Sequence, residues 1–211
     1  GYVEQGFGDE AVKCFRQMEE EQVSPDAVTY ACILKVCIII ESLEIGEEIH
    51  AKIGEQGLLR NDIVLSTTLM DMYTKCDAFQ RACQVFEEIQ ERDVVMWNSL
   101  IAVYVQLDQL YMVLNSLRRM RADGIQPNSV TFLFILDMCS HAGLLEEGEN
   151  FFQDMVVLYG LIPTTEHYSC MVDLFNSAGE FDKAKCFLIY NSSYPEWVKA
   201  LQSANDKNIA G

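Results

Sequence analysis

Histidine and cysteine are the residues of this chain best suited to metal or nucleophilic chemistry, and their spacing decides whether they could perform it. The sequence has three histidines and eight cysteines. A zinc site that activates water for deamination needs His-x-Glu together with Cys-x-x-Cys. His50 is followed by Ala-Lys, His141 by Ala-Gly and His167 by Tyr-Ser, and no Cys-x-x-Cys occurs. We therefore expect no metal, no cofactor and no catalytic site in this chain.

Other sequence patterns agree with a non-enzymatic protein. The chain has no P-loop, no His-Glu-x-x-His and no glycine-rich dinucleotide loop. Its cysteines fall at positions typical of helical cores, where a free thiol packs as a small hydrophobe, so we expect reduced, structural thiols. No apolar run approaches the roughly 20 residues of a membrane span. Neither a membrane nor a small-molecule substrate is therefore an expected partner.

One short pattern, a polar turn followed by the start of a helix, recurs along the chain. Residues 24–30 (Ser-Pro-Asp-Ala-Val-Thr-Tyr) match residues 126–132 (Gln-Pro-Asn-Ser-Val-Thr-Phe), and three variants of the pattern occur elsewhere. The turns close on Asp26, Asp62, Asp93, Asn128 and Thr164, at spacings of 36, 31, 35 and 36 residues. Periods of this length are typical of solenoids built from helical hairpins, in which each unit is too small to bury its apolar face alone.

Apolar periodicity divides each unit into two helices. Between residues 94 and 128 one series has i, i+3, i+4 and i+7 spacing, and a second series follows a break at residues 106–108. The first series is Met96, Trp97, Leu100, Ile101 and Tyr104, and the second is Leu110, Val113, Leu114, Leu117 and Met120. Short connections favour antiparallel pairs. The predicted fold is therefore all-α, a right-handed superhelical solenoid of tetratricopeptide-like helix pairs.

Several longer segments together resemble pentatricopeptide repeats of the plant organellar type. They are Tyr73-Thr74-Lys75-Cys76-Asp77, Ala82-Cys83-Gln84-Val85-Phe86, residues 91–98 (Glu-Arg-Asp-Val-Val-Met-Trp-Asn) and residues 139–144 (Cys-Ser-His-Ala-Gly-Leu). The unequal periods resemble the subclass that alternates standard, long and short repeats. Asp108 departs from the family pattern, because glycine is common at its position.

The resemblance divides the chain into seven segments. They are a partial repeat (1–26), a long repeat (27–62), a short repeat (63–93), a standard repeat (94–128), a long repeat (129–164), a degenerate short repeat (165–195) and the start of a C-terminal extension (196–211).

The resemblance also implies a set of RNA-contacting positions. Bases would be recognised by the residue after the first-helix aromatic and by the residue that closes the repeat, as in other helical-repeat RNA binders. The expected base-recognising residues are Thr67 with Asp93, Asn98 with Asn128, and Ser169. Val64, Val95 and Val130 would form apolar walls between which bases stack. Ala31 with Asp62 and Leu133 with Thr164 would be weak or spacer pairs. Taken singly, the polar helix-start residues could equally be local caps; their recurrence at one register favours recognition.

The net charge of the chain does not favour RNA binding. The formal net charge is −17, which is unfavourable for binding a polyanion. Only five of the 32 acidic residues fall in expected first helices, against Lys35 and Lys75, and the acidic clusters fall on expected second helices. In the family the first helices line the inner groove, so most of the acid would face outward. We expect weak RNA affinity from this segment alone.

Two functions follow from these patterns. By resemblance, the chain binds single-stranded RNA sequence-specifically in a mitochondrion or chloroplast, contributing to RNA processing or to recognition of cytidine-to-uridine editing sites, with editing-factor proteins as further partners. The family's recognition pattern implies guanine for Thr67 with Asp93 and a pyrimidine for Asn98 with Asn128. The alternative is a tetratricopeptide-like protein-interaction scaffold without RNA binding, which the acidic balance favours.

Overall fold

The computed structural model describes residues 8–60 and 62–190, in which every regular element is helical. The chain divides into two compact units between Val103 and Tyr104, and each unit is described by itself. The helices of the first unit are α1 (Gly8–Glu20), α2 (Ala27–Ile39), α3 (Leu43–Glu55), the 3-10 helix η2 (Leu58–Arg60), α4 (Ile63–Lys75) and α5 (Phe79–Glu88). Helix α6 (Val94–Gln106) crosses the boundary, and α7 (Leu110–Ala122), α8 (Ser129–Ala142), α9 (Leu145–Val157), α10 (Thr165–Ser177) and α11 (Phe181–Tyr190) follow.

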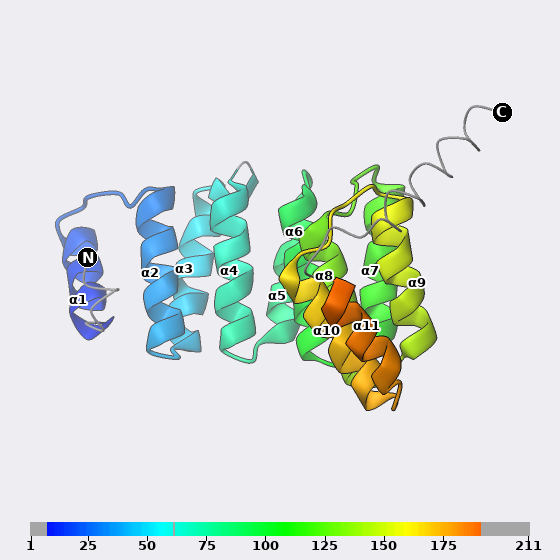
Figure 1. The fold of residues 1–211 in the computed structure, drawn as a ribbon. Helices are drawn as coiled ribbons and strands as arrows, with labels where there is room; N and C mark the ends of the chain where they lie inside the picture. The colour runs from blue at the N-terminus through cyan, green and yellow to red at the C-terminus, as the bar shows by residue number, and fades with distance from the viewer. Residues whose placement is uncertain (1–7, 61, 191–211) are drawn as a thin grey trace. The chain divides into compact units, whose positions relative to one another are not determined.

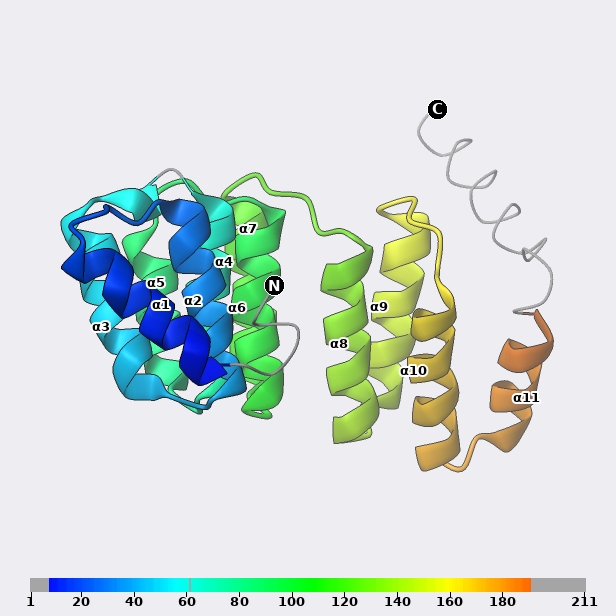
Figure 2. The same cartoon turned by 90° about the vertical axis from the view of Figure 1, so that its left-hand side faces the viewer.

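Both units contain antiparallel helix pairs (Figure 1). In the first unit α2 packs against α3 and α4 against α5; in the second unit α8 packs against α9 and α10 against α11. We call the earlier member of each pair the first helix and the later member the second helix. First helices also pack on one another, α2 on α4 and α8 on α10, as Figures 1 and 2 show. Because an antiparallel second helix separates them in sequence, neighbouring first helices run in the same direction.

First helices are buried on more sides than second helices. Helix α4 contacts α2, α3 and α5, and it buries Leu65, Leu69 and Tyr73 almost completely. Its partner α5 lies at the outside of the pair and buries a single stripe that includes Val85 and Phe86. A helix buried on several sides needs apolar residues around most of its circumference, whereas an outer helix needs one apolar stripe.

The turn inside each pair depends on one residue with a left-handed backbone. These residues are Glu41 (φ 52°), Asp77 (φ 56°), Asp108 (φ 51°), Gly143 (φ 67°) and Gly179 (φ 77°). Glycine adopts positive φ without steric cost, whereas a side chain at this position is strained. Asp108 therefore retains the backbone conformation of the family's usual glycine.

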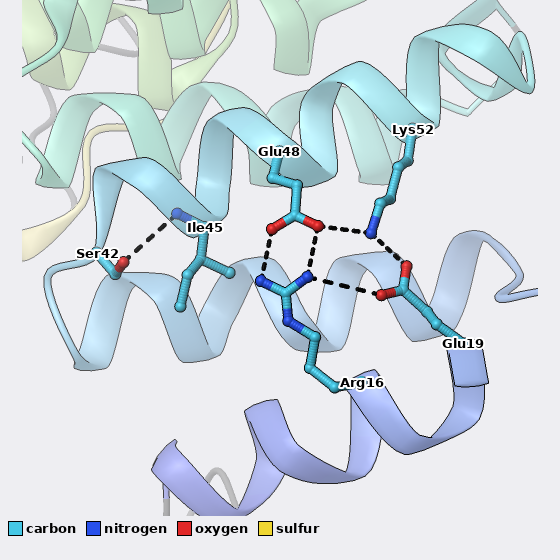
Figure 3. Close-up of polar contacts among 6 residues, drawn as sticks. All are labelled: Arg16, Glu19, Ser42, Ile45, Glu48 and Lys52. Carbon is cyan, nitrogen blue, oxygen red and sulfur yellow. Dashed lines mark hydrogen bonds and ion pairs between the residues drawn. The ribbon is translucent and has the colours of Figure 1, made fainter. Parts of the chain in front are cut away.

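Acidic residues on the second helices are partly neutralised by neighbouring pairs. Arg16 of α1 donates two hydrogen bonds to the Glu48 carboxylate of α3, at 2.5 and 2.6 Å (Figure 3). Lys52 of α3 donates to Glu48 at 2.7 Å and also to Glu19 of α1. These four residues, which we call the α1–α3 charge network, join the second helices of two consecutive repeats. The sequence predicted that this acid would simply be solvated, so the network is an additional finding.

The predicted all-α fold of repeated helix pairs is confirmed by this architecture. First helices begin at Ala27, Ile63, Val94, Ser129 and Thr165, each directly after a residue that was expected to close a turn. The expected start of a C-terminal extension at 196–211 lies outside the described residues, as does the first part of the segment 1–26.

Candidate nucleic-acid interface

Four exposed valines occupy the second position of four first helices. They are Val28 on α2, Val64 on α4, Val95 on α6 and Val130 on α8, with exposed fractions of 70, 69, 49 and 45%. Single exposed apolar residues are common on proteins, but their recurrence at one register indicates a surface that contacts something. Val64, Val95 and Val130 are the predicted stacking residues, and their side chains are accessible for that role. Val28 was missed by the sequence reasoning, although the Val-Thr-aromatic pattern that marks Val130 also contains it.

In each first helix, the residue directly before the predicted base-recognising position is buried. The buried residues are Tyr30, Ser66, Trp97, Phe132 and Tyr168. Of the residues that follow them, Ala31, Thr67 and Leu133 are half-buried and Ser169 is exposed. The Thr67 hydroxyl donates within its own helix to the carbonyls of Ile63 (2.9 Å) and Val64 (3.1 Å). Its oxygen therefore remains suited to accepting a hydrogen bond from a base edge.

Asn98 differs from the other predicted base-recognising residues. Its exposed fraction is 7%, so its amide presents much less surface than Thr67 or Ser169. Asn98 belongs to the first unit and its expected partner Asn128 to the second, whereas Thr67 and Asp93 belong to the same unit. Base recognition by Asn98 and Asn128 stays a prediction, and of the two complete polar pairs it is the one with less accessible surface.

The predicted repeat-closing residues cap the helices that follow them. The Asp62 carboxylate accepts from the Leu65 N–H at 2.8 Å through Oδ1, and the Asp93 Oδ1 accepts from Val95 (2.9 Å) and Met96 (3.0 Å). Asn128 forms a reciprocal capping box with Thr131. Capping explains why Asp and Asn occur at these positions. This agrees with the alternative, considered from the sequence, that the polar helix-start residues are local caps. For both aspartates these bonds use Oδ1 only, so capping holds the carboxylate in one orientation and leaves Oδ2 out of the cap.

Thr164 has the same capping role with an unusual partner. Its N–H donates to Nδ1 of His167 at 3.1 Å, and Nε2 of His167 lies 2.8 Å from the Ser129 carbonyl. Because Nδ1 accepts, Nε2 must carry the proton that it donates to Ser129. The buried His167 therefore ties the start of α10 to the start of α8. His167 therefore has a packing role, and Thr164 has a role that does not require RNA.

The exposed faces of the first helices carry different charges in the two units. Lys35 on α2 and Lys75 on α4 are exposed, whereas α10 exposes Glu166 and Asp173 and α8 carries the half-buried Asp137. A hydrogen bond from the Thr164 side chain lowers the pKa of Glu166, and its own backbone N–H adds to this. That carboxylate is therefore ionised at neutral pH. The first unit offers the more favourable surface for a polyanion.

The exposure of the cysteines corrects the expectation that all eight lie in helical cores. Only Cys37 and Cys139 are fully buried, and burial raises the pKa of Cys37 to about 11 and of Cys139 to about 12. Cys14, Cys32 and Cys186 are exposed, because apolar periodicity does not show which helix faces remain without a neighbour. Within residues 8–60 and 62–190, no group of His, Cys, Asp and Glu side chains is arranged to hold a metal ion. None of the helices described there is long and apolar enough to cross a membrane.

Sequence comparison identifies repeats of one kind over more than half of the chain. Models of the PPR repeat match residues 64–94 and 130–158, a PPR repeat family model matches residues 92–141, and a pentatricopeptide repeat domain model matches residues 1–38. A pentatricopeptide repeat-containing protein of Arabidopsis thaliana is 36% identical over 188 residues, which are 89% of this chain and 24% of that protein. Another Arabidopsis relative, named as mitochondrial, is 35% identical over 184 residues, or 87% of this chain and 29% of the relative. The chain thus spans about a quarter of the length of these relatives.

Solved structures share the fold. The pentatricopeptide repeat protein PPR10 from maize superposes with a TM-score of 0.72 at 24% identity, covering 98% of this chain and 29% of PPR10. PPR10 in complex with an 18-nucleotide psaJ RNA element gives a TM-score of 0.71 at 23% identity, over 95% of this chain and 29% of that chain. The sequence matches agree with the repeated helix pairs and the capped first helices. The chain therefore belongs to the pentatricopeptide repeat proteins.

Proposed function

We propose that this chain is part of an organellar protein that binds single-stranded RNA sequence-specifically, through the exposed face of its first helices. The observation that carries the proposal is the recurrence of exposed Val28, Val64, Val95 and Val130 at one register. Bases stack on flat or apolar side chains whatever their identity, so the valines would supply affinity without specificity. The RNA complex of the structurally similar PPR10 supports this choice of ligand.

Specificity would come from the polar residues beside the valines. Thr67 lies three residues after Val64 on the same helix face, and its hydroxyl oxygen can accept from a base. Asp93 is held in one orientation by its cap bonds to Val95 and Met96, and an oriented carboxylate is a selective hydrogen-bond acceptor. Asn98 with Asn128, and Ser169, would recognise further bases. Ala31 and Leu133 have no polar side-chain atoms, so their repeats would act as spacers.

The cellular role that we propose is narrower than RNA binding. We infer that the protein contributes to RNA processing or to recognition of cytidine-to-uridine editing sites in mitochondria or chloroplasts, together with editing-factor proteins. The unequal spacings of 36, 31, 35 and 36 residues, which resemble the subclass with alternating standard, long and short repeats, support the editing role. The relatives named as mitochondrial support an organellar location. Because the formal net charge is −17 and the described first helices carry only two lysines, Lys35 and Lys75, we expect the affinity of this segment alone to be low and to depend only weakly on salt.

Selection from a randomised single-stranded RNA pool tests the proposal. We expect enrichment of guanine followed by a pyrimidine, opposite Thr67 with Asp93 and Asn98 with Asn128. The variant Asn128→Asp preserves a good helix cap but removes the amide donor, so it should shift the second base toward uracil, with a preference of roughly 1–3 kcal/mol. Asp62→Asn, a comparable exchange in a spacer repeat, is the matched control and should leave the selected sequence unchanged.

The possible outcomes separate the two functions considered from the sequence. If the folded chain enriches no RNA, the scaffold alternative replaces RNA binding. If Asn128→Asp weakens binding equally for all sequences, Asn128 supports the fold or contacts the RNA backbone, and its proposed role in base recognition is wrong.

A further inference from the structure

Helix α7 differs in charge from the acidic second helices of the chain. It carries Arg118, Arg119 and Arg121 and has no carboxylate. Helix α3, in contrast, has four glutamates and one lysine, and α9 has four carboxylates and no lysine or arginine. Because the formal net charge of the chain is −17, α7 is a local basic surface on a strongly acidic protein.

An exposed aromatic residue shares a face of α7 with two of the arginines. The Tyr111 side chain is 74% exposed, and Arg118 and Arg121 are also exposed. Tyr111 and Arg118 are seven residues apart, or about two helical turns, and Arg121 follows about one turn later, so the three lie along one side of the helix. Ten residues of helix place them over a length of about 15 Å. We call Tyr111, Arg118 and Arg121 the α7 face.

The basic end of the α7 face is held in place by an aromatic contact. The Arg121 guanidinium lies 5.3 Å from the centroid of the Tyr159 ring, and that ring packs on Phe132 with a centroid separation of 5.2 Å. A guanidinium stacked on a ring keeps the N–H donors at its edge available. In the described part of the chain, no carboxylate forms an ion pair with Arg118 or Arg121. Both arginines can therefore bind an external carboxylate.

We propose that the α7 face docks an acidic segment of a partner protein. Carboxylates of the segment accept paired N–H bonds from Arg118 and Arg121, a geometry for which the planar guanidinium is suited. An apolar side chain of the segment packs on the Tyr111 ring. Tyrosine and arginine are the residue types that dominate the binding energy of many protein interfaces. The site lies outside the first helices, so this inference does not depend on the proposed RNA binding.

The charge around α7 favours a short protein segment over RNA or an anionic membrane. Arg121 contacts the segment that follows α9, and α9 itself carries Glu146, Glu147, Glu149 and Asp154. RNA affinity rises with the number of phosphates that are neutralised, and a strand or membrane that extended beyond three arginines would meet this acid. Exposed charges separated by more than about 8–10 Å are largely screened at physiological salt. A segment that lies along α7 therefore interacts mainly with the arginines.

Selection from a displayed library of random dodecapeptides, with the full 211-residue chain as target, tests the proposal. We expect the enriched peptides to combine several Asp or Glu residues with an apolar residue. Arg118→Ala with Arg121→Ala should weaken binding of a fluorescein-labelled selected peptide about tenfold or more, and Tyr111→Ser should weaken it severalfold. Lys13→Ala with Lys185→Ala is the matched control, because it removes two exposed cations from α1 and α11 and should leave the affinity unchanged.

The results that would overturn the proposal are specific. They are a selection that enriches no acidic peptide, or selected peptides that bind the double arginine variant as tightly as the unmodified chain. Arg118→Glu is a second variant that keeps the contact between Arg121 and Tyr159, so it should also weaken binding if loss of that contact unfolds the double variant. Oligouridine and phosphatidylglycerol vesicles are parallel probes: if the arginines are needed for one of these and not for the peptide, the partner is RNA or a membrane and the proposal is wrong. The arginine variants should leave the RNA sequence selected by the first helices unchanged, which separates this test from that of RNA binding.

Discussion

The first-helix faces of the two units share a framework but differ in charge. In the first unit, α2 and α4 carry Lys35, Lys75 and one carboxylate, Asp71. In the second unit, α8 and α10 carry the carboxylates Asp137, Glu166 and Asp173 and no lysine. In both units the two first helices pack on each other, begin at a capped turn and bury an aromatic residue. The shared parts are those on which folding depends, so the exposed face is free to differ and can determine what each unit binds.

The largest expected effect concerns how tightly the core is packed inside each unit. Phe86 is enclosed, with the Trp97 ring 4.8 Å away and the Arg92 guanidinium 4.6 Å from its ring centroid. Phe175 is equally buried but lines a cavity at α11. We expect Phe86→Ala to lower the free energy of unfolding by about 3–5 kcal/mol, and Phe175→Ala by less, because Phe86 is enclosed by neighbouring side chains whereas Phe175 lines a cavity. Urea denaturation of both variants measures this, and equal losses would show that the cavity is filled.

Charge exchange between the two faces should have the next largest effect, on RNA affinity. Lys35→Glu with Lys75→Glu should weaken binding on the order of tenfold or more, ~1.4 kcal/mol for a tenfold change, and reduce the salt dependence. Asp137→Lys with Asp173→Lys should strengthen binding by a similar factor. The matched control is Lys13→Glu with Lys185→Glu, which makes the same charge change on the second helices α1 and α11. If the control weakens binding as much as the first variant, net charge decides affinity and the first-helix face has no special role.

The turns within the helix pairs also differ between the units, and the effect should be smaller. Glu41 and Asp77 hold positive φ in the first unit, whereas in the second unit Asp108 does so at one turn and glycine at the other two, Gly143 and Gly179. A side chain there costs about 1–2 kcal/mol, and the extra entropy of unfolded glycine offsets roughly 0.5–1 kcal/mol of this. Glu41→Gly should therefore raise the free energy of unfolding by about 0.5–1 kcal/mol, and Gly143→Ala should lower it. Stabilisation by Gly143→Ala in thermal unfolding would contradict this account.

The sequence predicts features that depend on local interactions and misses features that depend on packing. Helix starts such as Ala27 and Ser129 follow from caps that bond only three residues ahead, so their signal is contained in a short segment. The Arg16–Glu48 contact joins residues 32 apart, and no local pattern marks it. The burial of Asn98 and the exposure of Cys32 depend on which helix faces have neighbours. The starts of the helices were therefore predictable, whereas the accessibility of the residues on them was not.

The smallest expected effect compares the α1–α3 charge network with the single Lys183–Glu149 pair of the second unit. Hydrogen bonds from Arg16 and then Lys52 lower the pKa of Glu48 from 4.5 to about 2. Because the folded pKa lies below the unfolded value, the ionised carboxylate stabilises the fold above pH 4.5. That contribution is lost as the pH falls toward 2. The Glu48 side chain is 37% exposed, so solvent screening limits the contribution to about 1 kcal/mol or less.

Glu48→Gln should therefore lower the free energy of unfolding slightly at pH 7 and match the unmodified chain near pH 2. Glu149→Gln should have no measurable effect at either pH, because it removes one exposed pair and leaves no other cation without its partner. Denaturation midpoints between pH 2.5 and 7 distinguish the two variants. The network works as a unit only if Glu48→Gln shows the larger loss and that loss shrinks with falling pH. If Glu149→Gln costs as much, bonds to two cations stabilise no better than a bond to one, and the two outer surfaces are equivalent.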